Sequence, residues 1–165
     1  MYYQLETAFI VAADLQTTWS FFSRAQNLPT ITPPWLDFRL LTPSPITLQQ
    51  DSIMDYTIRW LGARIHWRTR IIDWSPPHQF IDLQIRGPYT LWHHQHTFVP
   101  APGGNGTECR DRVVYKLPGM VLGRITHRLA VRRQLVEIFE YRQQQVANQL
   151  GLVSTAIKPS VTAIS

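Results

Sequence analysis

The sequence is poor in features that would tie it covalently or anchor it in a membrane. Cys109 is the single cysteine among 165 residues, which excludes an internal disulfide and any zinc site with several cysteine ligands. The longest wholly apolar run covers only residues 8–13, whereas a membrane-spanning helix needs about 20 apolar residues. The N-terminus has neither a basic start nor an apolar signal core, so we expect a cytoplasmic protein that does not cross a bilayer.

Several signatures of nucleotide and nucleophile chemistry are also missing. The sequence contains no Gly-x-Gly-x-x-Gly or Gly-x-x-x-x-Gly-Lys motif and no Gly-x-Ser-x-Gly elbow, so neither a nucleotide site nor a serine nucleophile is indicated. Charged residues make up 16% of the chain and hydrophobic residues 44%, a balance that excludes a disordered protein. The length fits one globular domain.

Turn residues divide the chain into short segments with apolar patterns. Most of the 12 prolines lie between such segments, because proline lacks the N–H that a β-ladder needs and disrupts helix interiors. Residues 3–11 predict a strand, Asp14 predicts the N-cap of a short helix ending near Phe22, and residues 24–34 predict a helical turn. Six more strands, joined as antiparallel hairpins, are expected at 36–42, 46–60, 64–74, 78–86, 90–99 and 107–117.

The region from 120 to 150 predicts one long amphipathic helix. It has no proline, and apolar residues recur in it at spacings of three, four and seven. A helix of about 26 residues is about 39 Å long, so it must lie across the sheet. We therefore predict an α+β domain over residues 1–150, in which a curved seven-stranded antiparallel sheet wraps around a long C-terminal helix and two short helices follow the first strand. Residues 151–165 are expected to be a loose tail.

The alternation of side chains along the strands indicates which face looks at this helix. Arg68 and Arg70 are expected outside, which places Trp67 inside, and the cations flanking Asp111 place Asp111 inside by the same argument. Ligand sites are typically concave and mostly apolar, with a few polar groups. The predicted ligand-binding residues are Trp67, Asp82, Gln84, Trp92, His94, His96, Phe98, Asp111 and Tyr115 on the strands, and Leu129, Val136 and Phe139 on the helix.

Two linked stretches also carry a family resemblance. Residues 87–98, with Trp92, His94 and His96, are followed by Asp111-x-Val113-x-Tyr115 and Pro118. Together with residues 67–80 and the helix with its paired arginines, they resemble the polyketide cyclase/dehydrase-like branch (coenzyme Q-binding/START) of the START-like (SRPBCC) superfamily, over roughly residues 3–150. The resemblance implies a helix-grip fold with a deep cavity for a hydrophobic small molecule. It implies no particular reaction, because lipid carriers, quinone binders and aromatase/cyclases all belong to the superfamily.

The histidine pair has four interpretations. Two histidines at i and i+2 of a strand point the same way and could hold a metal, but Pro100 occupies the place of the glutamate that a cupin needs, and a third ligand could come only from Asp82 or Asp111. We therefore predict no metal and no cofactor. The second interpretation is a hydrogen-bonded structural pair. The third is a pair that hydrogen-bonds a carbonyl or hydroxyl group of a ligand. The fourth is acid–base chemistry, with His94, His96 and Asp111 as candidate catalytic residues.

The net charge of +5 has its largest contribution in the C-terminal helix. Arg124, Arg128, Arg132 and Arg133 could contact an anionic surface, although a charged stripe is usually the solvated back of a helix. No nucleic-acid partner is expected. The favoured hypothesis is non-enzymatic binding or transport of a lipid, quinone or polyketide-like molecule. The alternatives are a cyclase or dehydratase using a cavity His/Asp pair, and an interaction protein that docks through its basic helix.

Overall fold

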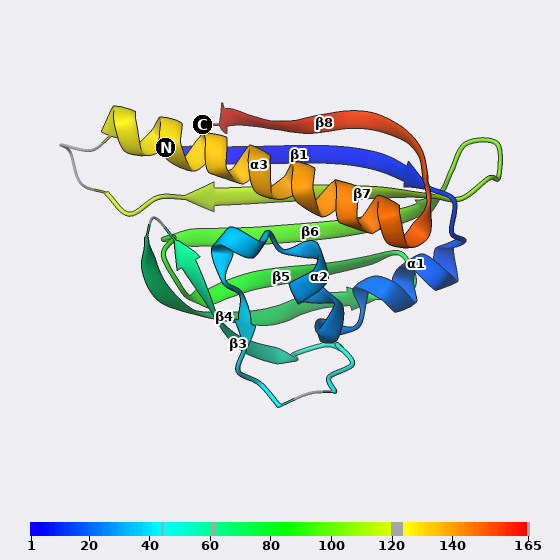
Figure 1. Ribbon diagram of the computed structural model, residues 1–165, viewed down its shortest axis with the longest axis horizontal. Helices are drawn as coiled ribbons and strands as arrows, with labels where there is room; N and C mark the ends of the chain where they lie inside the picture. The colour runs from blue at the N-terminus through cyan, green and yellow to red at the C-terminus, as the bar shows by residue number, and fades with distance from the viewer. Residues whose placement is uncertain (44, 61, 120–123, 165) are drawn as a thin grey trace.

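The computed structural model describes residues 1–43, 45–60, 62–119 and 124–164, and for residues 124–129 and 156 it describes the backbone alone. Over these residues eight strands form one antiparallel sheet in the order β2-β3-β4-β5-β6-β7-β1-β8 (Figure 1). The strands are β1 (Tyr2–Val11), β2 (Arg39–Leu40), β3 (Ile53–Trp60), β4 (Ala63–Ser75), β5 (Gln79–Arg86), β6 (Leu91–Pro100), β7 (Thr107–Lys116) and β8 (Leu152–Ile164).

One face of the sheet is covered by helices. The long helix α3 (Arg124–Leu150) runs across it, and the short helices α1 (Leu15–Phe22) and α2 (Leu28–Ile31) lie on the same face beside α3 (Figure 1). The 3-10 turns η1 (Ala25–Asn27) and η2 (Pro34–Leu36) flank α2. The predicted α+β helix-grip arrangement is therefore confirmed. Within the described residues, no helix combines the length and apolarity needed to span a membrane.

The start of α1 follows the sequence signal for a helix cap. Asp14 is extended, and its carboxylate Oδ1 accepts a hydrogen bond of 2.7 Å from the backbone N–H of Thr17. This bond satisfies one of the amide groups that every helix leaves unpaired at its N-terminus. The apolar side of α1 then packs into the core through Trp19 and Phe22.

The strand alternation that was predicted from the sequence is confirmed. On β4, Trp67 and Ile71 are buried while Arg68 is exposed, and on β7 Asp111 is buried between exposed arginines. On β6, every second side chain from Trp92 to Phe98 is buried. The inner face of the sheet therefore carries both the aromatic residues and the histidines of β6 toward α3.

The C-terminal segment corrects the sequence prediction. Residues 152–164, expected to be a loose tail, form strand β8, which pairs antiparallel with β1 and brings the sheet to eight described strands instead of seven. Gly151 ends α3 with a φ of 76°, a left-handed conformation that glycine adopts without strain. Its carbonyl accepts a hydrogen bond from the N–H of Ala12 on the β1 side, which starts the new pairing.

The segment before β3 also differs from the prediction. Only Arg39 and Leu40 of the expected strand 36–42 pair in the sheet, and β3 begins at Ile53 instead of residue 46. Residues 46–48 lie beside the end of α1, where the N–H of Leu48 donates to the carbonyl of Ser23 at 2.9 Å. This route places Leu48 in the core and makes the connection one wall of the cavity described below.

Candidate functional site

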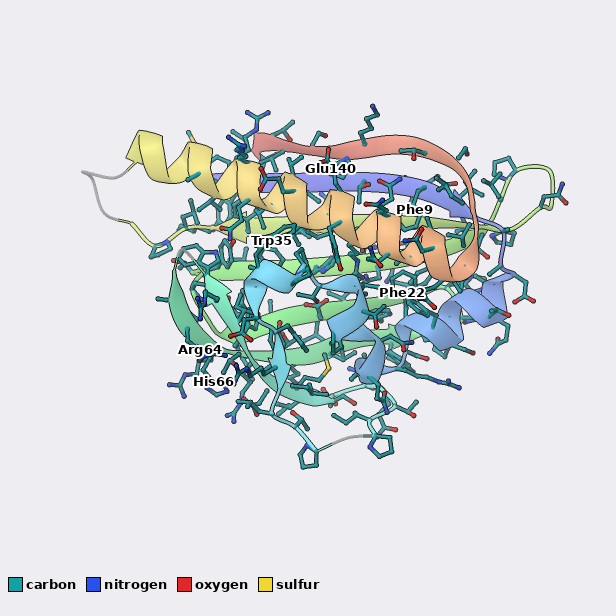
Figure 2. All side chains as sticks on the ribbon, in the orientation of Figure 1. Phe9, Phe22, Trp35, Arg64, His66 and Glu140 are labelled. Atoms are coloured by element: carbon teal, nitrogen blue, oxygen red, sulfur yellow. The ribbon has the colours of Figure 1, made fainter. Side chains whose placement is uncertain are left out.

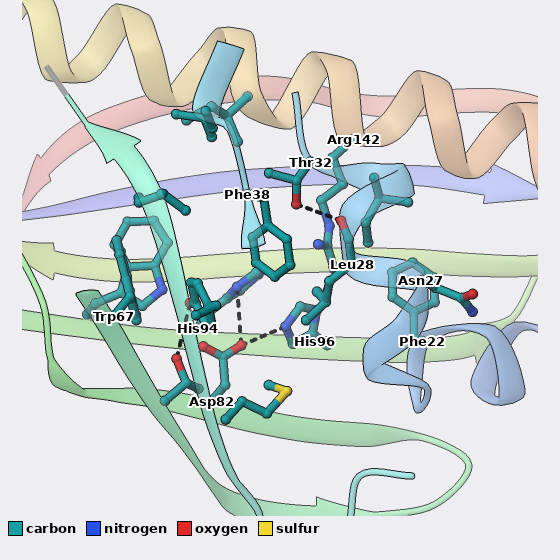
Figure 3. Close-up of a pocket in the computed structure, with 18 of the residues that line it drawn as sticks. Phe22, Asn27, Leu28, Thr32, Phe38, Trp67, Asp82, His94, His96 and Arg142 are labelled. Atoms are coloured by element: carbon teal, nitrogen blue, oxygen red, sulfur yellow. Dashed lines mark hydrogen bonds and ion pairs between the residues drawn. The ribbon is translucent and has the colours of Figure 1, made fainter. Parts of the chain in front are cut away.

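A cavity of about 170 Å³ lies between the inner face of the sheet, α3 and the connection that runs from α1 to β3 (Figure 3). Its wall is mostly apolar and takes residues from both hydrophobic clusters of the core. The main apolar and aromatic contributors are Phe22, Leu28, Ile31, Phe38, Leu48, Met54, Ile58, Trp67, Ile71, Phe80, Tyr89, Trp92, Leu135, Ile138 and Phe139. A concave, mostly apolar surface of this kind favours binding of small organic molecules.

The structure brings half of the predicted ligand-binding residues to this wall. The predicted residues that line the cavity are Trp67, Asp82, Trp92, His94, His96 and Phe139. They come from β4, β5, β6 and α3. Their role in binding remains a prediction.

Five of the other six predicted residues do not line the cavity, and each has a structural reason. The Gln84 amide donates to the carbonyl of Tyr89 at 2.7 Å and so holds the turn after β5. Phe98 packs on Phe22 in the core, and Tyr115 stacks on Tyr3 with ring centroids 5.4 Å apart. The remaining cases are Val136, which packs against the second core cluster, Asp111, which lies behind the histidines, and Leu129, whose side chain lies outside the described residues.

The sequence predictions did not include the part of the cavity wall that comes from the connection between α1 and β3. They also did not include the cation that α3 contributes. Residues 28–38 contribute Leu28, Ile31 and Phe38, but this segment has no helical or strand periodicity long enough to assign a face. Arg142 also lines the cavity, although it was not among the predicted ligand-binding residues. A signal did exist, because Arg142 follows the inward-facing Phe139 by three positions and therefore shares its side of the helix.

Four polar side chains from three neighbouring strands meet at the cavity. Asp82 is on β5, His94 and His96 are on β6, and Asp111 is on β7. The register pairs Asp82 with His94 and His96 with Asp111, so alternation alone directs all four side chains to the inner face. Figure 3 shows the carboxylate of Asp82 between the two imidazoles, with Arg142 reaching down from α3.

Each carboxylate contacts both imidazole rings. The Oδ1 of Asp111 lies 2.9 Å from Nε2 of His94 and 2.9 Å from Nδ1 of His96. The Oδ2 of Asp82 lies 2.9 Å from Nε2 of His96 and 3.4 Å from Nδ1 of His94. The two rings are 3.8 Å apart between centroids, so the four groups form one compact cluster.

Arg142 adds the positive charge of the cluster. Its Nε lies 3.7 Å from Oδ2 of Asp111, and its Nη2 lies 3.3 Å from Nδ1 of His96. The guanidinium also lies over the ring of Phe22, 5.3 Å from the centroid. Its Nε is buried and has no hydrogen-bond partner among the described residues. The cation is therefore held in place by several contacts and still has a donor to offer.

These contacts decide the charge states. Burial alone would raise the pKa of Asp111, but the charge of Arg142 and hydrogen bonds from His94 and His96 hold that pKa well below its usual range. Burial of Asp82 is likewise outweighed by His94, His96 and Arg142, so its pKa is also lowered. Burial, reinforced by the neighbouring His96, lowers the pKa of His94 to about 4. At neutral pH both carboxylates are ionised and His94 is neutral.

A second unpaired donor lies on the opposite part of the same wall. Trp67 is 5% exposed, and its indole Nε1 is buried with no hydrogen-bond partner among the described residues. The indole N–H can only donate. Trp67 and Arg142 therefore both leave a buried donor unsatisfied in one cavity.

The predicted basic surface of α3 is described in part. Arg132 and Arg133 are exposed, and Arg133 forms an ion pair with Glu137 one turn later, with Nε and Oε1 2.8 Å apart. The side chains of Arg124 and Arg128 lie outside the described residues. Contact with an anionic surface therefore stays a prediction.

Comparison with known proteins places the chain in a family. The family model described as "Polyketide cyclase / dehydrase and lipid transport" matches residues 11–140, and no relative was found among curated proteins. Similar solved structures include TTHA0849 from Thermus thermophilus, at 14% identity and a TM-score of 0.66 over 89% of this chain and 96% of that one. A START superfamily protein from Mycobacterium smegmatis matches at 16% identity and 0.65, over 90% and 97% of the two chains.

A third solved structure is the di-domain ARO/CYC StfQ from the steffimycin biosynthetic pathway. It matches at 15% identity with a TM-score of 0.68, over 92% of this chain and 51% of that one. Likeness at these identities shows the shared fold alone. The family model covers most of the domain, including the strands that carry the histidines and both aspartates. The chain therefore belongs to the polyketide cyclase/dehydrase and lipid transport family.

Proposed function

We propose that this protein binds a hydrophobic small molecule in the cavity, with the cluster around Asp82 and the indole of Trp67 recognising its polar groups. The observation that carries the proposal is a pair of buried donors in one mostly apolar cavity, Trp67 Nε1 and Arg142 Nε, which have no hydrogen-bond partner among the described residues. A buried donor without a partner costs about 1–3 kcal/mol. A ligand that supplies acceptors recovers this cost in addition to the free energy of burying its apolar surface.

The size and chemistry of the wall narrow the class of ligand. An engineered apolar cavity of about 150 Å³ takes up benzene, so the present volume of about 170 Å³ suits one or two aromatic rings. Trp67 and Arg142 require acceptor atoms, while the ionised carboxylate of Asp82 requires a donor. A quinone or polyketide-like aromatic compound with carbonyl and hydroxyl groups meets both requirements, whereas a saturated chain with one carboxylate meets only the first.

The first experiment compares the native and denatured masses of the purified protein. A bound organic mass that is released on denaturation identifies the ligand class directly. Calorimetric titration then uses naphthoquinone, naphthol and palmitate as probes, and we expect the two aromatic probes to bind more tightly than palmitate. Absence of a bound organic mass, together with no measurable heat from any of the three probes, would contradict the proposal.

A matched pair of variants tests whether the probes occupy this cavity. Ile138 lines the cavity from α3, so Ile138→Trp should fill part of it and weaken naphthoquinone binding at least about tenfold, equivalent to about 1.4 kcal/mol. Glu140 is exposed on the same helix (labelled in Figure 2), so Glu140→Trp adds the same side chain without changing the cavity. Equal affinity in the two variants would place the bound probe elsewhere.

A second candidate function is proton transfer on a bound ketone. It is supported by the Asp82–His96 pair, whose Oδ2 and Nε2 atoms lie 2.9 Å apart on the cavity wall, and by the fold shared with an aromatase/cyclase-type protein. We place it second because the lowered pKa of Asp82 makes this carboxylate a weak base. The test is solvent deuterium exchange at the acidic carbon of β-tetralone, followed by NMR. Enzymatic exchange should be lost in Asp82→Asn and kept in Asp73→Asn, which alters an aspartate outside the cavity wall.

A further inference from the structure

Three side chains on the cavity wall direct ligand atoms toward one point. Asp82, His94 and His96 each offer one such atom, and the three atoms lie within 4.8 Å of one another. All three residues line the cavity. We propose that they form a binding site for a divalent first-row transition metal ion, a site that goes beyond the binding of an organic molecule proposed above. Two imidazoles and one carboxylate are a donor set that suits zinc or ferrous iron better than calcium or magnesium.

On each imidazole, one nitrogen lies next to Asp111 and the other lies toward Asp82, and we call these the back and the front nitrogen. The Oδ1 of Asp111 touches the back nitrogens, Nε2 of His94 and Nδ1 of His96, at 2.9 Å each. The front nitrogens, Nδ1 of His94 and Nε2 of His96, both lie toward Oδ2 of Asp82. Histidines that bind metals usually donate the back N–H to a carboxylate, which fixes the ring and leaves the front lone pair free for the metal. Here Asp111 can accept such a bond from Nε2 of His94, and its Oδ1 lies equally close to Nδ1 of His96, which Nη2 of Arg142 also approaches at 3.3 Å.

The position of Asp111 relative to the cavity agrees with this division. Asp82, His94 and His96 line the cavity, whereas Asp111 is buried behind them and does not. A metal bound at the front nitrogens would therefore keep its remaining coordination positions open to the cavity. Such a metal could contact the polar end of a cavity ligand, as at catalytic sites with three protein ligands.

Hydrogen bonds alone cannot pair every ring nitrogen of the two histidines with the carboxylate that it faces. A neutral imidazole carries one N–H, so it cannot donate to carboxylates at both of its nitrogens. When Nε2 of His94 donates to Asp111, its Nδ1 lone pair faces the carboxylate of Asp82 across 3.4 Å. Two carboxylates against the single guanidinium of Arg142 also leave a net negative charge when both histidines are neutral. A divalent cation between the front atoms binds this lone pair and changes the net charge of the cluster from −1 to +1, and a bound proton is the competing explanation.

Metal binding requires a specific distance between the ligand atoms. Zinc bonds of about 2.0–2.2 Å in a tetrahedral site place ligand atoms roughly 3.3 Å apart. The contacts of Asp82 Oδ2 with the two front nitrogens, at 2.9 and 3.4 Å, already meet this spacing. The most distant ligand atoms, within 4.8 Å, must approach by up to roughly 1.5 Å. The side chain of Asp82 is 15% exposed at the cavity, which gives it room to adjust.

The experiment titrates chelator-treated, dialysed protein with Co²⁺, which reports its coordination by visible absorption, and with Zn²⁺ in competition. We expect one ion per chain. Binding should be lost in His94→Ala and in the nearly isosteric Asp82→Asn. The matched control is His66→Ala, which removes a histidine that contacts an aspartate, Asp55, at 2.6 Å on the outer face of the sheet. This control should bind the metal normally.

Asp111 is a positioning residue in this proposal and has its own readout. Asp111→Asn should lower the metal affinity about 10- to 100-fold and change the Co²⁺ spectrum while the stoichiometry stays at one ion. In the wild-type protein, Co²⁺ should also broaden the NMR signals of the His94 and His96 rings, a result that requires no variant to fold. The proposal is overturned if the wild type binds neither ion, if His94→Ala binds as tightly as the wild type, or if the broadened rings lie elsewhere. Because no organic molecule is added, these outcomes are independent of the proposed ligand binding.

Discussion

Asp111 and His94 are joined inside the protein by a 2.9 Å contact between Oδ1 and Nε2, and both side chains are buried. The other oxygen of Asp111 faces Arg142 at 3.7 Å. Removing one partner of a buried charge pair costs about 3–5 kcal/mol, and the effect here should lie at the lower end because Asp82 still offsets the charge of Arg142. We therefore expect Asp111→Asn to lower the free energy of unfolding by about 3 kcal/mol at neutral pH, as measured by urea denaturation.

A double-mutant cycle tests the charge argument behind this expectation. Arg142→Gln removes the guanidinium that Asp111 neutralises, so the double variant should be more stable than the sum of the two single effects predicts. Contacting charged residues usually show coupling of about 0.5–3 kcal/mol. Additive effects in the cycle would mean that Arg142 is not the group that Asp111 stabilises.

The unpaired indole N–H of Trp67 predicts opposite effects on stability and binding. Trp67→Phe keeps an aromatic ring in the wall but removes the buried donor. The free energy of unfolding of the ligand-free protein should fall by no more than the loss of buried ring area predicts, because an unsatisfied polar group is removed together with that area. Affinity for naphthoquinone should fall about fivefold, the worth of a hydrogen bond of about 1 kcal/mol, when measured by calorimetry.

Trp35 provides the control for this substitution. It is 51% exposed and does not line the cavity, so Trp35→Phe should change neither quantity. Unchanged naphthoquinone affinity in Trp67→Phe would show that the indole N–H does not contact the probe.

Much of the fold follows from periodicity in the sequence. Alternation along β4 and β6 placed Trp67, His94 and His96 on the inner face, and the spacing of apolar residues predicted the helix that crosses the sheet. These signals are local, because each depends on residues within a few positions of one another. The same argument directed Asp111 inward, and the structure confirms this position.

The arrangement of the site could not be derived in this way. Alternation gives the face of a side chain but not the strand register, and the register decides that Asp82 lies opposite His94 while Asp111 lies opposite His96. The contribution of Arg142 depends on how α3 lies over the sheet. The wall formed by Leu28 and Phe38 comes from a connection without periodicity, so no local pattern could assign it.

Strand β8 was missed because its apolar residues show no clear division between two faces. Leu152, Val153 and Ile157 are exposed, whereas Val161 is 3% exposed and pairs with Leu5 of β1. Val161→Ala removes two buried methyl groups and should lower the free energy of unfolding by about 1.5–2 kcal/mol, at roughly 0.8 kcal/mol for each buried group. Val153→Ala is the same change on the same strand at a position that is 54% exposed, and it should have little effect in the same urea denaturation. Equal losses in the two variants would mean that β8 does not pack on the domain as described.

The outer face of the sheet predicts a pH dependence that is separate from the cavity. Asp55 on β3 accepts hydrogen bonds from Arg68 at 2.8 and 3.0 Å and contacts Nε2 of His66. The bonds from Arg68 lower the pKa of Asp55, partial burial opposes this effect, and His66 adds to it. Because the folded pKa lies below the unfolded value of about 3.9, the unfolded chain takes up the proton first as the pH falls. The stabilisation is therefore complete above about pH 5 and is lost as the pH falls through the folded pKa.

The variant Asp55→Asn should accordingly be less stable than the wild type at pH 7 by no more than about 1 kcal/mol, because Arg68 is 45% exposed and exposed ion pairs contribute little. The difference should shrink as the pH falls below about 4 and also in high salt, which screens exposed charges. Urea denaturation of both proteins between pH 7 and pH 3 measures it. A gap that stays constant over this range would mean that the carboxylate charge of Asp55 makes no contribution, and that the variant acts through packing or hydrogen-bond geometry alone.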